Sequence, residues 1–262
     1  MLEIYASHLN LSDKFNPSLM SELMNFVDPS KQIKLRRFFR TEDKLRGLFA
    51  DLLIRHLIMQ RVGLDHKDIS FGTNEYGKPY LIDFDDFHFN ISHSGEWVVV
   101  AIDDRPVGVD VEEIQDIDLD IAKNYFSDIE HRDLMAKKNP NDYFFTLWSL
   151  KESYIKILGK GLSHPLNAFS IEFVNDNEIV IKENGHPIED ILFKQYDIDA
   201  RYKMGVCTTK RAFPNQVVML SMDELCQFFV KDHTTKNYWY PNAPEAYSYG
   251  NGTYNPERSS IL

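Results

Sequence analysis

Two carboxylates on one face of a predicted strand are the first candidates for chemistry. The run Val107–Glu112 alternates valine with other residues, so Gly108, Asp110 and Glu112 share one face and the valines share the other. Carboxylate oxygens beside phosphate and water are the ligands that Mg²⁺ prefers. Gly108, which has no side chain, is expected to leave room for a ligand. The pattern fits a metal-binding strand or a strand with a solvated polar face.

A predicted helix over 141–158 carries a third carboxylate and a lysine. Pro140 is typical of a helix start, and Gly159 is typical of a helix end. Glu152 and Lys156 stand four residues apart, so they lie on the same side of the helix. Glu152 would join the other carboxylates and Lys156 would contact a phosphate. The alternative is an exposed pair that stabilises the helix by a few tenths of a kcal/mol, roughly.

Two further segments can contact an anion. Phe89–Gly95 sets His93 among serines and a glycine, where the ring and backbone N–H groups can meet a phosphate. Glu75–Pro79 reads as a tight turn that offers Lys78 to a phosphate. Both segments are equally compatible with ordinary turns. The sequence contains neither a Gly-x-Ser-x-Gly elbow nor a glycine-rich nucleotide-binding fingerprint, which argues against those enzyme classes.

Charge is unevenly distributed along the 262 residues. The chain has 29 Lys plus Arg against 40 Asp plus Glu, a net charge of −11, which disfavours a general nucleic-acid binder. Lys31–Arg46 nevertheless contains seven basic and two acidic residues, and Asp103–Asp120 contains eight acidic residues and one basic residue. Such a pair of segments suits a protein that holds a polyanion through a metal ion, although both could be solvated faces.

An α+β fold made of two similar halves is expected to position these residues. In residues 1–105 the patterns predict strands near 2–6, 80–82, 88–92 and 97–102 and helices over 18–26, 29–39 and 41–62. In residues 106–230 they predict strands over 107–112, 169–174, 178–181, 188–196, 203–207 and 217–220 and helices over 119–126, 128–137 and 141–158. We expect a pseudo-two-fold arrangement with the active site in the cleft between the halves. Residues 231–262 contain few aliphatic residues and are expected to form a flexible tail.

Together, in this order, the motifs resemble those of the 4′-phosphopantetheinyl transferases, specifically the large two-half type that activates surfactin synthetase and related peptide synthetases. Each motif alone is weak, but the combination is specific, and the similarity extends over about residues 1–225. The matching segments are Glu75–Pro79, Phe89–Gly95, Gly108–Glu112, Trp148–Lys156 and Gly159–Leu162.

The resemblance implies a role for each matching residue. Asp110, Glu112 and Glu152 match the Mg²⁺ carboxylates of the family. Lys156 matches the lysine at the pyrophosphate, and Glu152 or Glu130 matches the catalytic base. The matching coenzyme A contacts are Lys31, Lys34, Arg46, Lys78, Pro79, Ser92 and His93. The region 159–190 corresponds to the surface on which the carrier protein docks.

Electrostatics agrees with these implied roles. The phosphates of coenzyme A account for the cationic segment, whereas three carboxylates facing a pyrophosphate would repel it. Each pair of unit charges about 4 Å apart is worth about 4 kcal/mol at an effective dielectric constant of 20. A divalent cation between the two groups removes this repulsion.

The implied reaction moves 4′-phosphopantetheine from coenzyme A to a serine of an apo peptidyl or acyl carrier protein and releases adenosine 3′,5′-bisphosphate. Activation of peptide synthetases in antibiotic biosynthesis is the expected role. Two alternatives stay open: a coenzyme A or nucleotide pyrophosphatase, and a non-enzymatic module that binds coenzyme A or a carrier. The chain has no signal-peptide pattern, no membrane-spanning apolar run and two cysteines without metal spacing. We therefore expect a cytoplasmic monomer with no nucleic-acid or membrane partner.

Overall fold

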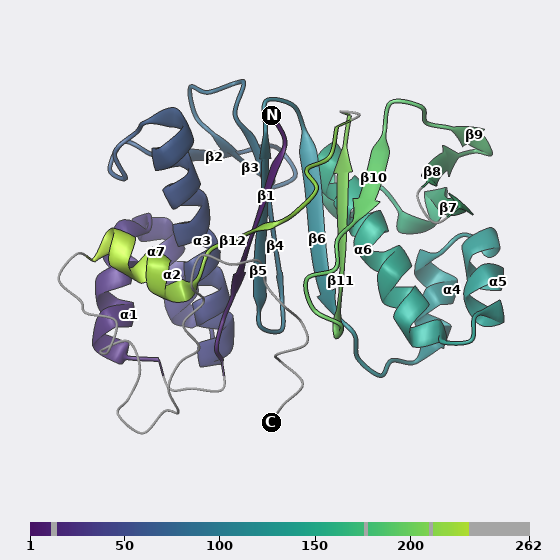
Figure 1. Cartoon of the computed structure of the whole chain (residues 1–262), viewed down its shortest axis with the longest axis horizontal. Coiled ribbons are helices and arrows are strands. Elements are labelled where there is room, and N and C mark those ends of the chain that lie inside the picture. Colours follow the sequence, from purple (N-terminus) through teal and green to yellow (C-terminus); the bar gives the residue numbers. More distant parts are fainter. Residues whose placement is uncertain (12–14, 176–177, 210–211, 231–262) are drawn as a thin grey trace.

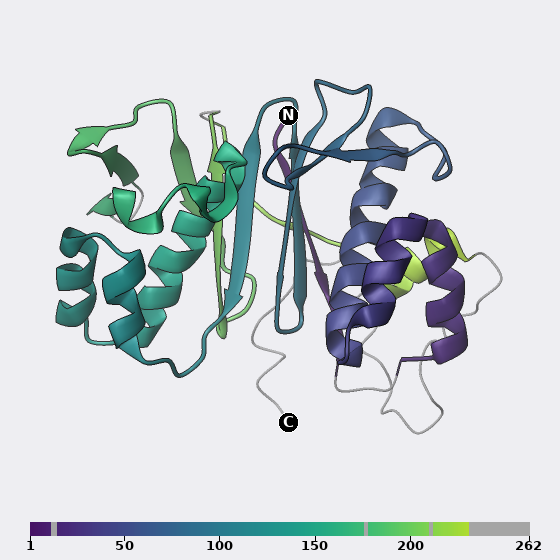
Figure 2. The same ribbon diagram turned by 180° about the vertical axis from the view of Figure 1, so that it is seen from behind.

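The computed structural model describes residues 1–11, 15–175, 178–209 and 212–230. Strands lie at the centre of the molecule and helices cover its two outer sides (Figures 1 and 2). The first part of the chain contains strands β1 (Glu3–His8), β2 (Phe71–Thr73), β3 (Pro79–Leu81), β4 (His88–Ser94) and β5 (Trp97–Asp103). Its helices are α1 (Pro17–Leu23), α2 (Pro29–Arg37) and α3 (Thr41–Val62).

The second part begins with the strand that carries the predicted carboxylates. Its strands are β6 (Val107–Glu113), β7 (Phe169–Asn175), β8 (Glu178–Glu183), β9 (His186–Pro187), β10 (Leu192–Gln195) and β11 (Tyr202–Thr208). Its helices are α4 (Ala122–Tyr125), α5 (Asp128–Ala136) and α6 (Pro140–Leu158). Strand β12 (Val218–Met219) and helix α7 (Met222–Phe229) end the described chain. None of the helices in the described ranges is long and apolar enough to cross a lipid bilayer.

Two sheets meet at the centre. One has the strand order β12-β1-β5-β4 and the other has the order β10-β11-β6. Strand β4 of the first sheet lies beside β6 of the second, and the Asn90 side chain joins them by accepting a hydrogen bond from the Val109 N–H (2.9 Å). The predicted alternation of β6 is confirmed, because Val107, Val109 and Val111 are fully buried in a core that includes residues of β1, β5 and β11.

Helix α3 confirms the prediction of a helix over 41–62. Glu42 and Asp43 lie in its first turn, where acidic groups favour the positive end of the helix dipole. Gly63 ends the helix in the left-handed conformation, with φ of 82°. The buried side of α3 packs in the large core between the first sheet and the outer helices.

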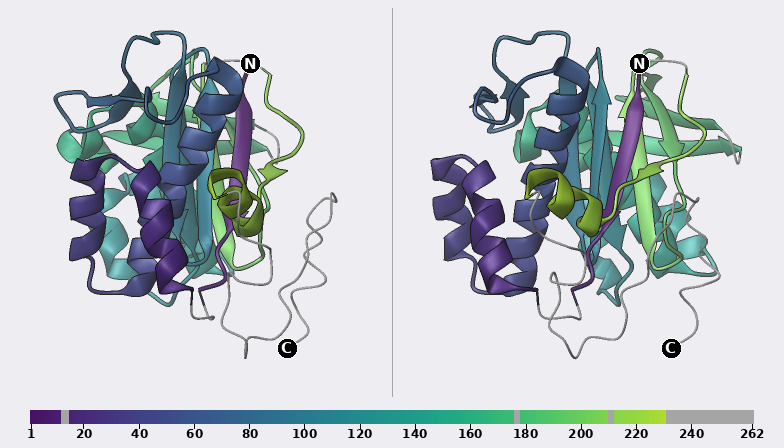
Figure 3. Two further views of the ribbon diagram at one scale, coloured as in Figure 1. Left: turned by 90° about the vertical axis from the view of Figure 1, so that its left-hand side faces the viewer. Right: turned by 60° about the vertical axis from the view of Figure 1, so that its left-hand side comes forward.

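The end of the described chain differs from the expected division into halves. Residues 106–230 were expected to form the second half, yet Val218 of β12 pairs in parallel with Tyr5 of β1. Helix α7, which the sequence analysis does not predict, packs against α3 and buries Leu225 and Phe229 in the first core (Figure 3). A capping box between Ser221 and Glu224 begins this short amphipathic helix.

Other boundaries differ by smaller amounts. The helix expected over 119–126 is a 3₁₀ turn at 119–121 followed by the single turn of α4. The strand expected over 188–196 is limited to β10. The tail expected over 231–262 lies outside the described residues.

Candidate active site

Two glycines bring helix α6 close to the second sheet. A Cβ added at Gly108 would lie 1.9 Å from the Ser153 carbonyl oxygen, and one at Gly205 would lie 2.9 Å from the Ser149 carbonyl oxygen. The space beside Gly108 is therefore filled by the backbone of α6, not left for a ligand as the sequence analysis expects. This close packing places α6 over the polar face of β6, with Glu152 and Lys156 near its carboxylates.

An ion pair between Lys156 and Asp110 lies at the centre of the site. The Lys156 ammonium donates to Asp110 Oδ1 (2.5 Å), to Ser92 Oγ (2.8 Å) and to the Val109 carbonyl (3.2 Å). Ser92 Oγ donates to the same Asp110 oxygen at 2.7 Å. The structure thus brings together three predicted site residues from β4, β6 and α6.

The three predicted metal carboxylates lie near one another, and the pKa of each is raised. Burial raises the pKa of Asp110 despite the neighbouring Lys156. Burial and, to a smaller extent, the Asp110 carboxylate raise the pKa of Glu112 to about 7. The same two causes, in the same order, raise the pKa of Glu152. Such a group of carboxylates is stabilised by any cation that neutralises it.

The carboxylate group fits a hard metal ion in its chemistry. Asp110 Oδ2 is buried and has no hydrogen-bond partner among the described residues, so a buried oxygen is left for a cation. Glu112 accepts one hydrogen bond, from Ser94 Oγ at 3.1 Å. In the ranges that the structure describes, no three His, Cys, Asp or Glu side chains are grouped so that they could hold a metal ion as they stand. The ammonium of Lys156 neutralises Asp110 instead.

Three cationic side chains act electrostatically on His93, which lies near the end of β4. Its side chain is exposed at the surface, yet the surrounding protein still lowers its pKa. Arg46, Lys156 and Lys31 lower this pKa further, in that order, so charges from α3, α6 and α2 all act on His93. The predicted contacts Lys31, Arg46 and His93 therefore belong to one region. Lys34 is exposed on α2, and Pro79 is exposed at the start of β3.

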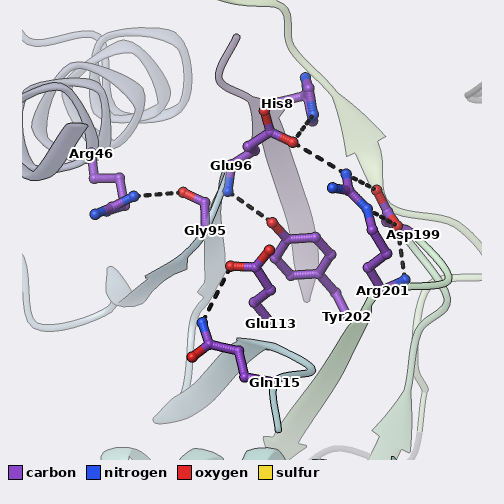
Figure 4. Close-up of polar contacts among 9 residues, drawn as sticks. All are labelled: His8, Arg46, Gly95, Glu96, Glu113, Gln115, Asp199, Arg201 and Tyr202. Carbon is purple, nitrogen blue, oxygen red and sulfur yellow. Dashed lines mark hydrogen bonds and ion pairs between the residues drawn. The ribbon is translucent and has the colours of Figure 1, made fainter. Parts of the chain in front are cut away.

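The turn after His93 is held from both sides (Figure 4). Arg46 donates to the Gly95 carbonyl at 2.8 Å. The Glu96 N–H donates to the Tyr202 hydroxyl at 2.9 Å, and the Glu96 carboxylate pairs with Arg201 at 3.1 Å. Since Arg201 directly precedes β11 and Tyr202 begins it, the second sheet fixes the turn that follows His93.

Two of the predicted site residues, Lys78 and Glu130, contact other parts of the protein. The Lys78 ammonium donates to the Lys156 carbonyl at the end of α6 (2.6 Å). Glu130 is 2 % exposed, and its carboxylate accepts hydrogen bonds from Lys151 (2.7 Å to each oxygen). It also accepts bonds from the Ile171 N–H (2.8 Å) and from Ser127. A carboxylate so enclosed is an unsuitable base, and this changes the role expected for Glu130.

Two residues with informative partners are not among the predicted site residues: Ser94, which bonds Glu112 in the site, and Lys151, which pairs with Glu130 in the second core. Lys151 lies one helical turn from Leu147 and near Tyr154, both of which belong to the apolar side of α6. Because a lysine is rarely buried without a partner, a lysine on the apolar side of a helix indicates that a buried acidic group pairs with it. Ser94 gives no comparable signal, because serine is common in turns.

The fold and the site define an α+β protein that groups carboxylates, a lysine and further cationic side chains where two sheets meet. A family model described as "4'-phosphopantetheinyl transferase, N-terminal" matches residues 14–105, and one described as "4'-phosphopantetheinyl transferase superfamily" matches residues 106–207. The chain is 44% identical over 229 residues to the 4'-phosphopantetheinyl transferase Sfp of Bacillus subtilis, covering 86% of this chain and 100% of that protein.

Two other relatives extend this similarity. The 4'-phosphopantetheinyl transferase psf-1 of Bacillus pumilus is 38% identical over 227 residues, 86% of this chain and 97% of that protein. The 4'-phosphopantetheinyl transferase gsp of Aneurinibacillus migulanus is 37% identical over 218 residues, 82% of this chain and 90% of that protein. The chain belongs to the 4′-phosphopantetheinyl transferase family. The predicted family, the α+β class and the transfer of phosphopantetheine to a carrier protein are thereby confirmed.

Proposed function

We propose that this transferase acts at the Asp110–Lys156 pair, depends on Mg²⁺, and modifies peptidyl carrier domains of peptide synthetases. The observation that carries the proposal is the meeting of Ser92, Asp110 and Lys156 between β4, β6 and α6. The 44% identity to a phosphopantetheinyl transferase over most of the chain supports it. A cytoplasmic monomer without nucleic-acid or membrane partners remains a prediction.

Coenzyme A would bind with its phosphates in the cationic region. Lys31 and Arg46 already act electrostatically on His93, so an anion there meets several positive charges. The residues that would contact the substrate are Lys31, Lys34, Arg46, Pro79, Ser92 and His93. The pKa of His93 is lowered, and an adjacent phosphate would raise it again and so favour the protonated form.

Asp110, Glu112 and Glu152 would hold the Mg²⁺ ion. When bound, the ion would neutralise these carboxylates and polarise the phosphate oxygens of coenzyme A. The buried and unpaired Asp110 Oδ2 is the observation that favours a cation here.

The protein's own groups then carry the proton and the charge. The carrier serine hydroxyl attacks the β-phosphorus of coenzyme A, the bond to the α-phosphate oxygen breaks, and adenosine 3′,5′-bisphosphate leaves. Glu152 accepts the serine proton. Lys156 donates to the pyrophosphate and stabilises the charge that develops on the leaving oxygen.

The carrier would dock on the region 159–190, which follows α6 directly. This region contains a 3₁₀ turn at 161–163 and the hairpin of β7 and β8. The Leu162 side chain, which the sequence analysis expects to matter for docking, lies outside the part of the chain that the structure describes.

The intact mass of an apo peptidyl carrier tests the proposal. We expect a gain of one phosphopantetheine with coenzyme A and Mg²⁺, and no gain when EDTA replaces Mg²⁺. The variant Asp110→Ala should lose at least about 100-fold in turnover and keep its fold, as judged by circular dichroism. Cleavage of coenzyme A without transfer would favour the pyrophosphatase alternative. Normal turnover by Asp110→Ala would contradict the assigned site.

A further inference from the structure

A tight turn between β2 and β3 contacts the end of the catalytic helix. Within the turn, the Asn74 side-chain oxygen accepts hydrogen bonds from the N–H groups of Tyr76 and Lys78, both at 2.9 Å. Gly77, with φ of 86°, donates its N–H to the Asn74 carbonyl at 3.0 Å. These bonds fix the backbone from which the Asn74 and Lys78 side chains extend.

Both side chains reach the last carbonyls of α6. The Lys78 ammonium donates to the carbonyls of Lys156 (2.6 Å) and Ile157 (3.4 Å), and the Asn74 amide donates to the Gly159 carbonyl (2.8 Å). The last carbonyls of a helix have no partner within it and form the negative end of its dipole. A cation and an amide donor at this end are therefore favourable.

Gly159 is what allows the turn to approach so closely. It ends α6 with φ of 68°, in the left-handed region that favours glycine. A Cβ at this position would lie 3.0 Å from the Lys78 side chain and 3.2 Å from the Asn74 amide nitrogen. The sequence therefore provides a glycine both for the helix end and for the contact with the turn.

Both the side chain and the backbone of Lys156 are therefore fixed by hydrogen bonds. Its ammonium pairs with Asp110 and Ser92, and its carbonyl accepts a hydrogen bond from Lys78. Lys78 comes from the first part of the chain, whereas Lys156 and Asp110 come from the second. The contact therefore fixes the catalytic lysine relative to the elements that would bind coenzyme A.

We propose that Asn74 and Lys78 are positioning residues, which act by fixing the backbone of Lys156 at the end of α6. Lys78 then serves the transfer reaction through Lys156 and is not a ligand of a coenzyme A phosphate. This inference rests on the proposed role of Lys156 in the reaction. The Lys78 ammonium is partly buried against the end of the helix, and this burial lowers its pKa to about 8. Such burial is consistent with a structural role for Lys78.

The variant Lys78→Met tests this role, because methionine keeps most of the stem and removes the charge and the donor. We expect kcat for carrier modification to fall at least about tenfold, since Lys156 loses a fixed backbone. The dissociation constant of coenzyme A, measured by calorimetry, should change less than about twofold. Asn74→Ala should lower kcat in the same direction by a smaller factor, and Lys78→Arg should recover most of the activity.

Dephospho-coenzyme A, which lacks the 3′-phosphate, separates positioning from phosphate binding. A positioning residue lowers kcat by the same factor with both substrates. A ligand of the 3′-phosphate would weaken coenzyme A binding and leave binding of dephospho-coenzyme A unchanged, which would overturn the proposal. Unchanged kcat in Lys78→Met would overturn it as well.

A double-mutant cycle with Lys156→Met completes the test. If Lys78 acts through Lys156, adding Lys78→Met to Lys156→Met causes no further loss of kcat, whereas independent roles give multiplicative losses. Lys67→Met, at an exposed lysine that follows α3, is the matched control for loss of one positive charge. Activity of the wild-type enzyme reports on the proposed function separately, so failure of the positioning role leaves it standing.

Discussion

Asp110 and Lys156 neutralise one another among carboxylates that would otherwise repel. Asp110 is almost completely buried, and both Lys156 and Ser92 donate charge-assisted hydrogen bonds to its carboxylate. Among the described residues neither Glu112 nor Glu152 forms an ion pair, and burial raises the pKa of both. These carboxylates are destabilised when they are ionised, so the site favours the binding of a cation.

The Glu112 carboxyl predicts how stability depends on pH in metal-free protein. Its pKa is about 7 in the fold and 4.5 as the ordinary value. Between these values the folded state holds a proton that the unfolded state has released, so the free energy of unfolding falls as pH rises through this window. Urea unfolding in EDTA at several pH values should show a shallower decline for Glu112→Gln than for the wild type. Identical slopes would contradict the assignment.

The buried pair of Glu130 and Lys151 predicts a stability effect. Glu130→Gln leaves the Lys151 ammonium fully buried without its counter-charge, which should cost about 3–5 kcal/mol of unfolding free energy. The double variant Glu130→Gln/Lys151→Met removes both charges and should recover part of this loss. Urea denaturation of the three proteins measures the effect. If Glu130 were the catalytic base, Glu130→Gln would lose turnover without losing stability, and the double variant would not recover that turnover.

At the scale of elements, helix α6 is the component that assembles the site. In its first turn the Asp142 N–H donates to the Asn139 side-chain oxygen, which caps the helix. Its middle packs on β6 and β11, and its end contacts the Asn74–Lys78 turn. Buried Ser149 and Ser153 face the sheet at the two glycines, so the helix backbone approaches closely. Small residues on both surfaces thus set the distance between α6 and the carboxylates of β6.

Gly108→Ala tests this packing. The added methyl group would overlap the Ser153 carbonyl oxygen, so α6 must move away from β6. We expect a loss of about 1–3 kcal/mol or more in unfolding free energy, together with a fall in kcat as Lys156 separates from Asp110. Gly205→Ala, where the methyl group is less crowded, should cost less in both measurements. The reverse order of the two variants would contradict this view of the interface.

At the scale of the whole molecule, the two parts of the chain are joined at several separate points. Asn90 bonds the backbone of β6, Glu96 pairs with Arg201, and Lys78 bonds the end of α6. After the second part, the chain returns to the first part: β12 pairs with β1, and α7 packs on α3. The two parts therefore share one fold, and the first core needs residues from the end of the described chain.

Two truncations test the contribution of α7. A chain that ends after Leu220 lacks Leu225 and Phe229 and exposes the core they cover, so it should lose at least about 3 kcal/mol of stability. A chain that ends after Val230 keeps every contact described here, and we expect its melting temperature and activity to match the full chain. Thermal unfolding followed by circular dichroism compares the three proteins. Equal stability of the shortest chain would show that α7 is dispensable.

Local patterns alone predict much of this protein. The alternation in 107–112 and the helices over 41–62 and 141–158 follow from residue type and spacing. Spacing also makes Asp110, Glu112, Glu152 and Lys156 candidates for a site, although it leaves ordinary structural roles open, and the family resemblance implies their roles. Periodicity decides which side of an element is buried, and that is enough to group polar side chains on one face. The order of the motifs was enough to indicate the family.

Tertiary structure alone decides which partner each side chain meets. Glu130 and Lys151 lie 21 positions apart and pair in the core, and Lys78 reaches the carbonyl of Lys156, 78 positions away. Helix α7 is too short and too far from β1 along the chain for its place in the first core to be read from its sequence. Contacts between distant segments depend on how layers pack, and local spacing carries no information about that packing. For the same reason, the sequence suggested space for a ligand beside Gly108, where the fold places the backbone of α6.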